Sequence, residues 1–382
     1  MTYMNAMKRG FRSIFKHKGM MIIVFIGPIF LTLLFGGIYY NDYVKDVPVA
    51  VLDEDCTSLS RLVNSYFITN ERFQVTNYPE SRQELQELID NGEVQMGLYI
   101  PKGFESKVGT YKSSEILVIT DGSNVVTANN ALAQATMIVQ SVSAGIEMKL
   151  IQGKGVLPAV AENMALVYNI GERILFDPKM TYMNYLMICF LAIFIQQLML
   201  AAMGGSFFRE SEYITHGDTA KKVLGIVSSC FIAMIPALIA SILILKMLFH
   251  VPFTGNMLTV VIMTLCFILA LTGPSLIMLS LTKDRIKYSQ LEFMLSLPTF
   301  ATAGCVWPVE QMPWILAVIM KISWPLIYYA KTVQEVIIKG MGFITVLPNI
   351  ISLLLFSAIW FPLGIHLYKK SFTLTYSDTI QQ

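Results

Sequence analysis

The sequence predicts a polytopic α-helical membrane protein with six transmembrane helices and an α/β extracytoplasmic domain inserted between helices 1 and 2. Of its 382 residues, 54% are hydrophobic and 14% are charged, whereas soluble domains carry about 25% charged residues. Residues 41–178 hold 18 acidic and 10 basic residues, and the rest of the chain holds 8 acidic and 18 basic residues. Long apolar runs separate the basic clusters. The pattern indicates water around 41–178 and lipid around most of the remainder.

The first segment, 1–19, is predicted to form an N-terminal amphipathic cytoplasmic helix. Its apolar residues recur with helical spacing and its basic residues lie on the other faces: Met7, Phe11, Ile14 and Phe15 against Lys8, Arg9, Arg12 and Lys16. Such a helix suits the anionic inner leaflet of a membrane. The alternative is that these residues are only the positive flank of the span that follows.

Six apolar runs are expected to cross the bilayer. The first, 20–40, has no charged residue and reaches the ~30 Å of the hydrocarbon core, so we expect a retained span rather than a signal peptide. The other five lie within 181–370, at 182–208, 223–249, 257–281, 286–306 and 341–368. The run at 286–306 contains Glu292 and Pro298. The stretch 307–330 is predicted to be an outer re-entrant segment.

The distribution of Lys and Arg predicts the orientation. Thirteen of them flank one set of span ends, and four lie at the opposite ends, namely Lys246, Lys321, Lys331 and Lys339. The positive-inside rule places the first set in the cytoplasm. Both termini, including the tail 371–382, are then cytoplasmic, and 41–180 lies outside. The expected location is the inner, or cytoplasmic, membrane.

The outer domain, 41–180, alternates strand and helix patterns. Strands are expected near 47–52, 73–78, 94–100 and 115–120, and helices near 57–68, 81–90, 101–111 and 125–151. This order predicts a small α/β domain with a partly parallel sheet. The acidic run 53–55 is interpreted as a turn whose carboxylates favour a helix N-terminus, with a metal site as the alternative.

The five cysteines suggest neither a disulfide framework nor a metal site. Cys56 is the only one in the outer domain, so that domain cannot close a disulfide by itself. The other four lie in apolar segments and are expected to behave as small hydrophobic residues: Cys189, Cys230, Cys266 and Cys305.

The sequence contains no catalytic constellation. It lacks a phosphate-binding loop, H-E-x-x-H, G-x-S-x-G and any paired-cysteine metal motif. The chain is therefore not expected to be an enzyme, and the energy for any uphill transport must come from elsewhere. Polar residues within spans are costly, so Gln196 and Gln197 either contact a substrate or bond between helices. Glu292 is expected at the inner interface or paired with Lys287.

Several runs resemble ABC-2 type permeases, the membrane subunits of type V ABC exporters, in the subgroup with a large outer domain. They are VPVAVLDED at 47–55, GLYIPKGF at 97–104 with DGSN at 121–124, FDPKMTYMNY at 176–185, AGCVWPVEQMP at 303–313 and IKG at 338–340. The resemblance covers nearly the whole chain. Its specificity comes from the order and spacing of the runs.

The resemblance implies a permease that works with cytoplasmic ABC ATPase subunits and a second permease subunit, in a homodimer or a heterodimer. This chain would bind membrane lipid but no cofactor or metal, and ATP-Mg would bind to the partner ATPase. No nucleic-acid partner is expected. The family's coupling segment matches 209–222, with Arg209, Glu210, Ser211 and Glu212 as ATPase-coupling residues. The family's usual continuation is replaced by HGDTA at 216–220.

By the same resemblance, spans two and five line the substrate pathway. The residues expected there are Gln196, Gln197, Met199, Met203, Phe207, Met294 and Phe300. The Met and Phe residues among them suit an adaptable apolar pocket and suggest a hydrophobic or amphipathic substrate (drug, lipid or peptide-like) leaving the cytoplasm or inner leaflet. The alternative is a membrane receptor or sensor with an extracytoplasmic ligand-binding domain.

Overall fold

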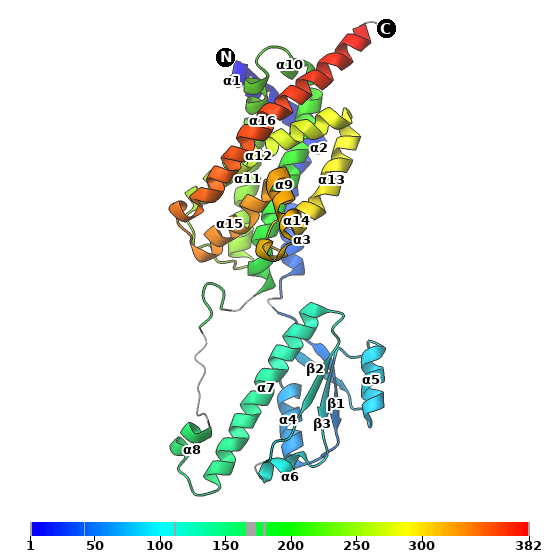
Figure 1. The fold of residues 1–382 in the computed structure, drawn as a ribbon, viewed down its shortest axis with the longest axis vertical. Coiled ribbons are helices and arrows are strands. Elements are labelled where there is room, and N and C mark those ends of the chain that lie inside the picture. The colour runs from blue at the N-terminus through cyan, green and yellow to red at the C-terminus, as the bar shows by residue number, and fades with distance from the viewer. Residues whose placement is uncertain (1, 42, 111, 166–172, 179–180, 381–382) are drawn as a thin grey trace. The chain divides into compact units, whose positions relative to one another are not determined.

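The computed structural model describes residues 2–41, 43–110, 112–165, 173–178 and 181–380. The chain divides into two compact units (Figure 1). Unit 1 consists of Met1–Asp42 with Ile174–Gln382, and unit 2 of Tyr43–Arg173. In the described residues unit 1 is helical, whereas unit 2 contains a β-sheet.

Unit 2 is built on a four-stranded sheet in the order β2-β1-β3-β4. Strand β1 pairs in parallel with β2 and β3, and β4 pairs antiparallel with β3. The elements in chain order are β1 (Val47–Asp53), α4 (Ser58–Ile68), β2 (Phe73–Asn77), α5 (Arg82–Asp90), β3 (Met96–Ile100), α6 (Phe104–Gly109), β4 (Leu117–Thr120), α7 (Val125–Gln152) and α8 (Pro158–Ala165).

Both faces of this sheet are covered, because alternate residues of a strand point to opposite sides. Val49 and Val51 of β1 pack with Val63 of α4 and with the apolar side of α7 in one core cluster. Leu52 of the same strand joins a second cluster with Leu85 of α5. A strand that is apolar on both faces is typical of a parallel sheet between helices.

Asp55, in the acidic run at the end of β1, serves as a helix cap. The Asp55 carboxylate accepts hydrogen bonds from the backbone N–H groups of Gly103, Phe104 and Glu105, at 2.7, 3.0 and 3.0 Å. Burial alone would raise the pKa of Asp55, but these bonds and one from the Thr57 hydroxyl hold it below its ordinary value. The carboxylate thus caps the N-terminus of α6, whose first N–H groups have no partner within the helix.

Unit 1 is a bundle in which α9, α11, α12 and α16 are the long helices (Figure 1). Its elements are α1 (Thr2–Lys16), α2 (Lys18–Met21), the π-helical turn η1 (Ile22–Ile26), α3 (Gly27–Ile38), α9 (Tyr182–Arg209), α10 (Ser211–Thr215), α11 (Thr219–Met247), α12 (Met257–Thr282), α13 (Arg285–Ala301), the 3₁₀ turn η2 (Val309–Gln311), α14 (Trp314–Ser323), α15 (Leu326–Lys339) and α16 (Phe343–Ile380).

The described part of the chain contains five helices long and apolar enough to cross a membrane, one fewer than the six expected. They are Lys18–Ile38, Tyr182–Arg209, Thr219–Met247, Met257–Thr282 and Phe343–Phe372. The predicted span 286–306 is shorter than expected, because α13 has 17 residues and is ~26 Å long. The chain turns after Thr302, with Gly304 at a φ of +86°.

Helix α13 nevertheless runs antiparallel to α9 along most of its length. The Tyr288 hydroxyl, near the start of α13, donates to the Leu200 carbonyl at 3.0 Å. Thr299, near its end, accepts a hydrogen bond from Gln196 at 3.2 Å. Residue numbers rise on one helix as they fall on the other, which is the signature of an antiparallel pair.

Cys189 and Cys305 form a disulfide, with a Cα–Cα distance of 6.3 Å. The expectation that both behave as free hydrophobic residues is therefore wrong. The antiparallel course of α13 carries the turn after it to the beginning of α9, which brings together two cysteines 116 residues apart in sequence. Cys56, Cys230 and Cys266 are free.

The segment expected to re-enter folds into a hairpin of α14 and α15. The chain turns at Trp324, whose indole N–H donates to the Gln196 side chain in the middle of α9 at 2.7 Å. The returning helix α15 then reaches the beginning of α9, where Gln334 donates to the Tyr185 carbonyl at 2.6 Å. The hairpin thus enters the bundle and leaves it at the same end. The re-entrant segment was predicted to end at residue 330, whereas α15 continues to Lys339.

Candidate functional site

One end of unit 1 collects α1, α10 and the first turns of α11 and α13 (Figure 1). We call it the basic end, because its exposed side chains include Lys8, Arg9, Arg12, Lys221 and Arg285. The four residues expected to couple to an ATPase lie here, where α9 ends and α10 begins, and we call them the coupling turn.

Those four residues have different surroundings. Arg209 is partly buried and donates through Nε to Ser13 Oγ of α1 at 3.3 Å, and Ser211 is buried. Glu210 forms an ion pair with Arg9 of α1 at 3.5 Å. Glu212 is exposed. Two of the four residues therefore bind α1, and Glu212 is the acidic one left facing solvent.

An aromatic ring between two cations links α1, α10 and α11. The Arg9 guanidinium lies 4.1 Å from the centroid of the Tyr213 ring, and Lys222 Nζ lies 4.2 Å from it. Lys222 also donates to the backbone carbonyls of Tyr213 and His216. Cation–π contacts of this kind are strongest where the cation is desolvated, and Lys222 is buried.

The sequence placed Arg9 on the basic side of the N-terminal amphipathic helix and placed Tyr213 and Lys222 within the coupling segment 209–222, without an individual role for any of the three. The available signal was the aromatic residue Tyr213 between acidic Glu212 and basic Lys222 in a short turn. That pattern does not show that Arg9 completes the arrangement, because Arg9 is far away in the sequence. It lies 201 residues before Glu210, with which it pairs.

Helix α1 is held against α11 by small residues. A Cβ at Gly225 would lie 2.6 Å from the Tyr3 carbonyl oxygen, and a Cβ at Gly10 would lie 2.0 Å from Ser229 Oγ. Such close approach requires glycine and is common between membrane helices. Of the predicted apolar stripe, Ile14 is buried and Phe15 is exposed. Helix α1 is thus docked on the bundle and keeps part of its apolar surface outward.

Among the expected pathway residues, Gln196 is wholly buried and satisfied. Its amide donates to Thr299 of α13, and its carbonyl accepts from Trp324 of the hairpin. One side chain therefore joins three elements, as expected for hydrogen bonding between helices. Gln197 Oε1 is buried and has no hydrogen-bond partner in the described residues.

The apolar pathway residues do not share one surface. Met199, Met203 and Phe207 are fully buried within the single chain, and Phe300 stacks on Phe190 with ring centroids 5.1 Å apart. Met294, in contrast, is 63% exposed. Its neighbours Phe293 and Leu297 are 79% and 73% exposed. These three residues form an uncovered apolar face of α13.

Glu292 lies on α13 but does not face that surface. It is 5% exposed, and its Oε2 has no hydrogen-bond partner within the described ranges. Glu292 therefore does not pair with Lys287 in the part of the chain described, and its expected place at the inner interface stays a prediction. One turn earlier, Tyr288 packs so tightly on α9 that a Cβ at Gly204 would lie 2.1 Å from its ring. This packing carries Glu292 into the bundle.

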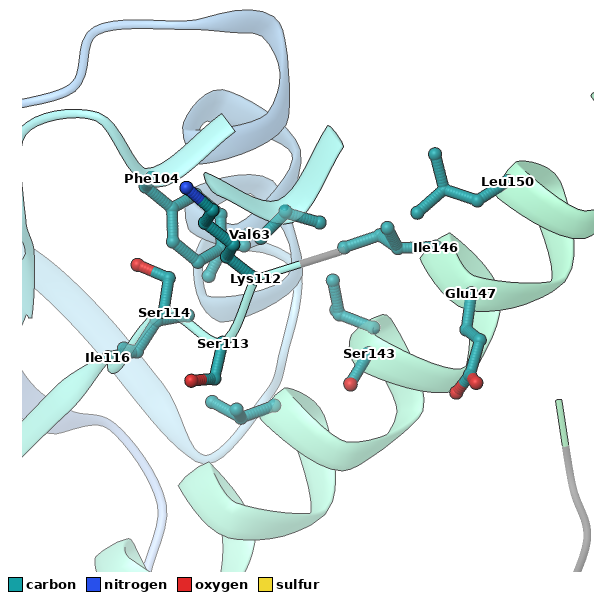
Figure 2. Close-up of a pocket in the computed structure, with 13 residues that line it drawn as sticks. Val63, Phe104, Lys112, Ser113, Ser114, Ile116, Ser143, Ile146, Glu147 and Leu150 are labelled. Atoms are coloured by element: carbon teal, nitrogen blue, oxygen red, sulfur yellow. The ribbon is translucent and has the colours of Figure 1, made fainter. Parts of the chain in front are cut away.

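Unit 2 contains a separate cavity of about 300 Å³ between α4, α6, α7 and the loop that precedes β4. Figure 2 shows Lys112, Ser113 and Ser114 of the loop across from Ser143 and Ile146 of α7. Phe104 and Val63 form the apolar floor, and both are buried. Ser114 Oγ is buried without a partner in the part of the chain described. The cavity is apolar inside and polar at its rim.

The chain resembles known transport proteins along most of its length. Residues 18–366 match the family described as ABC-2 family transporter protein. No solved structure is a significant match.

Three curated relatives from Escherichia coli K12 are similar over most of both chains. The probable multidrug ABC transporter permease YbhR is 21% identical over 325 residues, 82% of this chain and 84% of its own. The probable multidrug ABC transporter permease YbhS is 21% identical over 357 residues, 90% of each chain. The inner membrane transport permease YhhJ is 20% identical over 343 residues, 85% of each chain.

Proposed function

Because this chain belongs to the ABC-2 family of transporter proteins, we propose that it is the membrane-spanning permease subunit of an ATP-binding-cassette exporter. It moves a hydrophobic or amphipathic substrate out of the cytoplasm or the inner leaflet, and a separate ATPase subunit supplies the energy. The observation that carries this proposal is the family match over 18–366. The arrangement of the basic end supports it, since the acidic residue Glu212 there faces solvent.

Helix α13 acts as the sixth crossing in this proposal. The contacts of α13 and of the turn that follows it with α9 extend from Gly204, against Tyr288, to Cys189, bonded to Cys305. These positions on α9 are 15 residues, or ~22 Å, apart, so α13 covers most of the depth of a span already long enough to cross. With six crossings, both termini lie on the same side.

Two independent features support the same orientation. The basic end carries the positive charge that the cytoplasmic side retains. The disulfide between Cys189 and Cys305 lies toward the opposite end of α9, and disulfides persist in oxidising compartments outside the cytoplasm. The basic end is therefore cytoplasmic, and unit 2, inserted after the first span, is extracytoplasmic.

The ATPase contacts the basic end through α10. Glu212 is exposed for that contact, whereas Glu210 and Arg209 hold α1. Closure of the ATPases around ATP-Mg would push α10, and the cation–π contacts of Arg9 and Lys222 with Tyr213 would carry that movement to α1 and α11. This chain needs no cofactor of its own for that role.

A second permease subunit, identical or related, covers the apolar face of α13. Phe293, Met294 and Leu297 are each more than half exposed in the single chain, and an exposed apolar face between spans suits either lipid or a partner helix. The route would run between the two α13 faces. Of the expected pathway residues, Met294 is placed to line it, and Met199 and Met203 could do so only if helices separate.

The proposed coupling is tested by substituting Glu210→Gln and Glu212→Gln together in the reconstituted complex. Loss of hydrogen bonds to charged groups costs about 1.5–3 kcal/mol each, so the affinity for the ATPase should fall at least about tenfold. Transport per ATP hydrolysed should fall with it. Glu310→Gln with Glu335→Gln, at the opposite end of the unit, is the matched control. Unchanged coupling in the first variant would contradict the assignment.

The cavity of unit 2 favours a second candidate function, a membrane receptor or sensor with an extracytoplasmic ligand-binding domain. Ile146→Trp in the full chain would fill the cavity that Figure 2 shows. A fluorescent naphthylamine probe should then bind more weakly than to the unsubstituted chain. If transport persists in this variant, ligand binding is a separate sensing role, and if transport is lost as well, the cavity belongs to the export route.

A further inference from the structure

A concave polar surface lies between α1 and the coupling turn. It has a volume of about 330 Å³ and is lined by Asn5, Lys8, Arg9 and Arg12 of α1 and by Tyr213 of α10. The four α1 residues are spaced at i, i+3, i+4 and i+7, which places them on one helical face. We call this surface the α1–α10 pocket.

We propose that the α1–α10 pocket binds the phosphate headgroup of an anionic phospholipid. This inference does not rest on the proposed export function, because it follows from the charges, shape and position of the pocket alone.

The charge of the pocket is strongly unbalanced. Three cations line it, and the one acidic partner recorded for them is Glu210, 3.5 Å from Arg9. Lys8 and Arg12 form no ion pair with any residue that the structure describes. Like charges three and four residues apart on a helix repel each other. A phosphate group relieves this repulsion and accepts hydrogen bonds from guanidinium and ammonium groups together.

The pocket is built before any ligand binds. Gly10 and Gly225 fix α1 against α11 at van der Waals distance, and the Tyr3 hydroxyl donates to Ser228 Oγ at 2.8 Å. On the other side, the Tyr213 ring is held between Arg9 and Lys222. The α1 wall is therefore fixed by contacts outside the pocket, and the Tyr213 wall is backed from outside by Lys222, which lowers the ordering cost of binding.

The position of α1 identifies a lipid as the source of the phosphate. Helix α1 ends at Lys16, and the first candidate span begins at Lys18, so α1 lies where a span enters the membrane. Met4 and Phe15 of α1 are exposed and apolar. A helix with a basic face and exposed apolar residues lies at headgroup depth, with its apolar side chains among the acyl chains.

Binding of a phosphate has a consequence for the coupling turn. The pair between Arg9 and Glu210 is long at 3.5 Å, and Arg9 is about half exposed, so it contributes little to stability. A phosphate that takes the Arg9 guanidinium would release Glu210. Glu210 would then join Glu212 on the exposed side of the turn, and lipid composition would change the surface offered at the basic end.

Native mass spectrometry of the full chain in detergent tests the site, with phosphatidylglycerol and phosphatidylcholine as probes. We expect the first phosphatidylglycerol to bind at least about tenfold more tightly than phosphatidylcholine, as one charge-assisted contact of 1.4 kcal/mol or more provides. Lys8→Gln with Arg12→Gln should remove this preference. Tyr213→Phe, which keeps the ring and removes the hydroxyl, should weaken it by a smaller factor.

The matched control is Lys283→Gln with Lys287→Gln, which removes two exposed cations of the basic end outside the pocket. Equal losses in both double variants would mean diffuse charge attraction and would overturn the proposal. A second experiment adds inorganic phosphate as a competitor for the bound lipid. If the phosphate displaces the lipid at equal concentration, the pocket is a site for free anions and the lipid assignment is wrong.

Discussion

The two ends of the helical unit are held together by different chemistry. At the end that holds the start of α9, a disulfide joins Cys189 to Cys305. Next to it, in the middle of α9, the buried Gln196 bonds to both Thr299 and Trp324. At the basic end, α1 and α10 are joined by an ion pair, cation–π contacts and side-chain bonds to backbone carbonyls. Covalent and buried contacts hold one end, and partly exposed polar contacts hold the other.

This difference assigns a mechanical role to each end. The polar contacts of the basic end are weak singly and easily exchanged, so α10 and α1 would shift if the proposed ATPase presses on them. The disulfide fixes α9 to the turn after α13 at the other end. A movement that enters at the basic end would therefore tilt α9 and α13 about their bonded ends rather than separate them there.

Removing the disulfide is expected to have the largest effect. Cys189→Ser with Cys305→Ser should lower the free energy of unfolding by about 2–4 kcal/mol, because the bridge closes a long loop. Thermal unfolding in detergent measures this change. Cys56→Ser, at an exposed free cysteine, is the control. If the double variant were as stable as the control, the disulfide would not be what stabilises this end of the helical unit.

Crowding the contact of α1 with α11 is expected to have the next largest effect. Gly225→Ala places a Cβ 2.6 Å from the Tyr3 carbonyl oxygen, and overpacking of this kind costs about 1–3 kcal/mol. Helix α1 should detach and become sensitive to protease. Gly19→Ala, where a Cβ meets nothing within 4 Å, should leave α1 protected. Equal protection in both variants would show that α1 is not held at this contact.

Breaking the bond of the hairpin to α9 is expected to cost less. Trp324→Phe keeps the ring volume in part and removes the hydrogen bond to Gln196. Hydrogen bonds between membrane helices contribute about 0.6 kcal/mol on average, so the midpoint of thermal unfolding should fall slightly. Trp314→Phe, at an exposed position of the same hairpin, should change nothing. A larger loss in the exposed variant would argue against the buried bond.

The smallest expected effect concerns His17 at the basic end. The nearby Arg209 cation, then burial and then Lys16 and Arg285, lower the pKa of His17. Since the folded chain holds this proton less tightly than the unfolded chain, acidification below the ordinary pKa of about 6.5 favours unfolding. Arg209→Gln should raise the pKa of His17, as read from carbon-13 histidine NMR, whereas Lys246→Gln should not. An unchanged pKa in the Arg209 variant would contradict the electrostatic account of this end.

Much of the fold was predictable because its signals are local. Apolar runs identify five spans, and the alternation of strands and helices in unit 2 follows from short patterns. Helix α13 was harder to predict, because Glu292 and Pro298 interrupt its apolar run and the chain turns after Thr302. The orientation of the spans and the outer position of unit 2 stay predictions.

The candidate site was predicted only in part, because its contacts join distant segments. The coupling turn was located by resemblance, but the bonds of Tyr213 to Arg9 and Lys222 depend on how α1 docks. The pairing of Cys189 with Cys305 spans 116 residues, and sequence spacing does not reveal connectivity. Gln196 was singled out correctly as unusual, whereas its partners became visible only in the folded chain.

Reconstitution of the chain with its ATPase in lipid vesicles tests the central claim most directly. The protein is oriented so that its basic end faces the outside of the vesicle. A fluorescent amphipathic dye and ATP-Mg are supplied outside, and accumulation of the dye in the lumen is measured. The account predicts accumulation when chain, ATPase and ATP are all present, and none when any one is omitted. Accumulation by the chain alone, or failure of the ATPase to bind the intact chain, would contradict it.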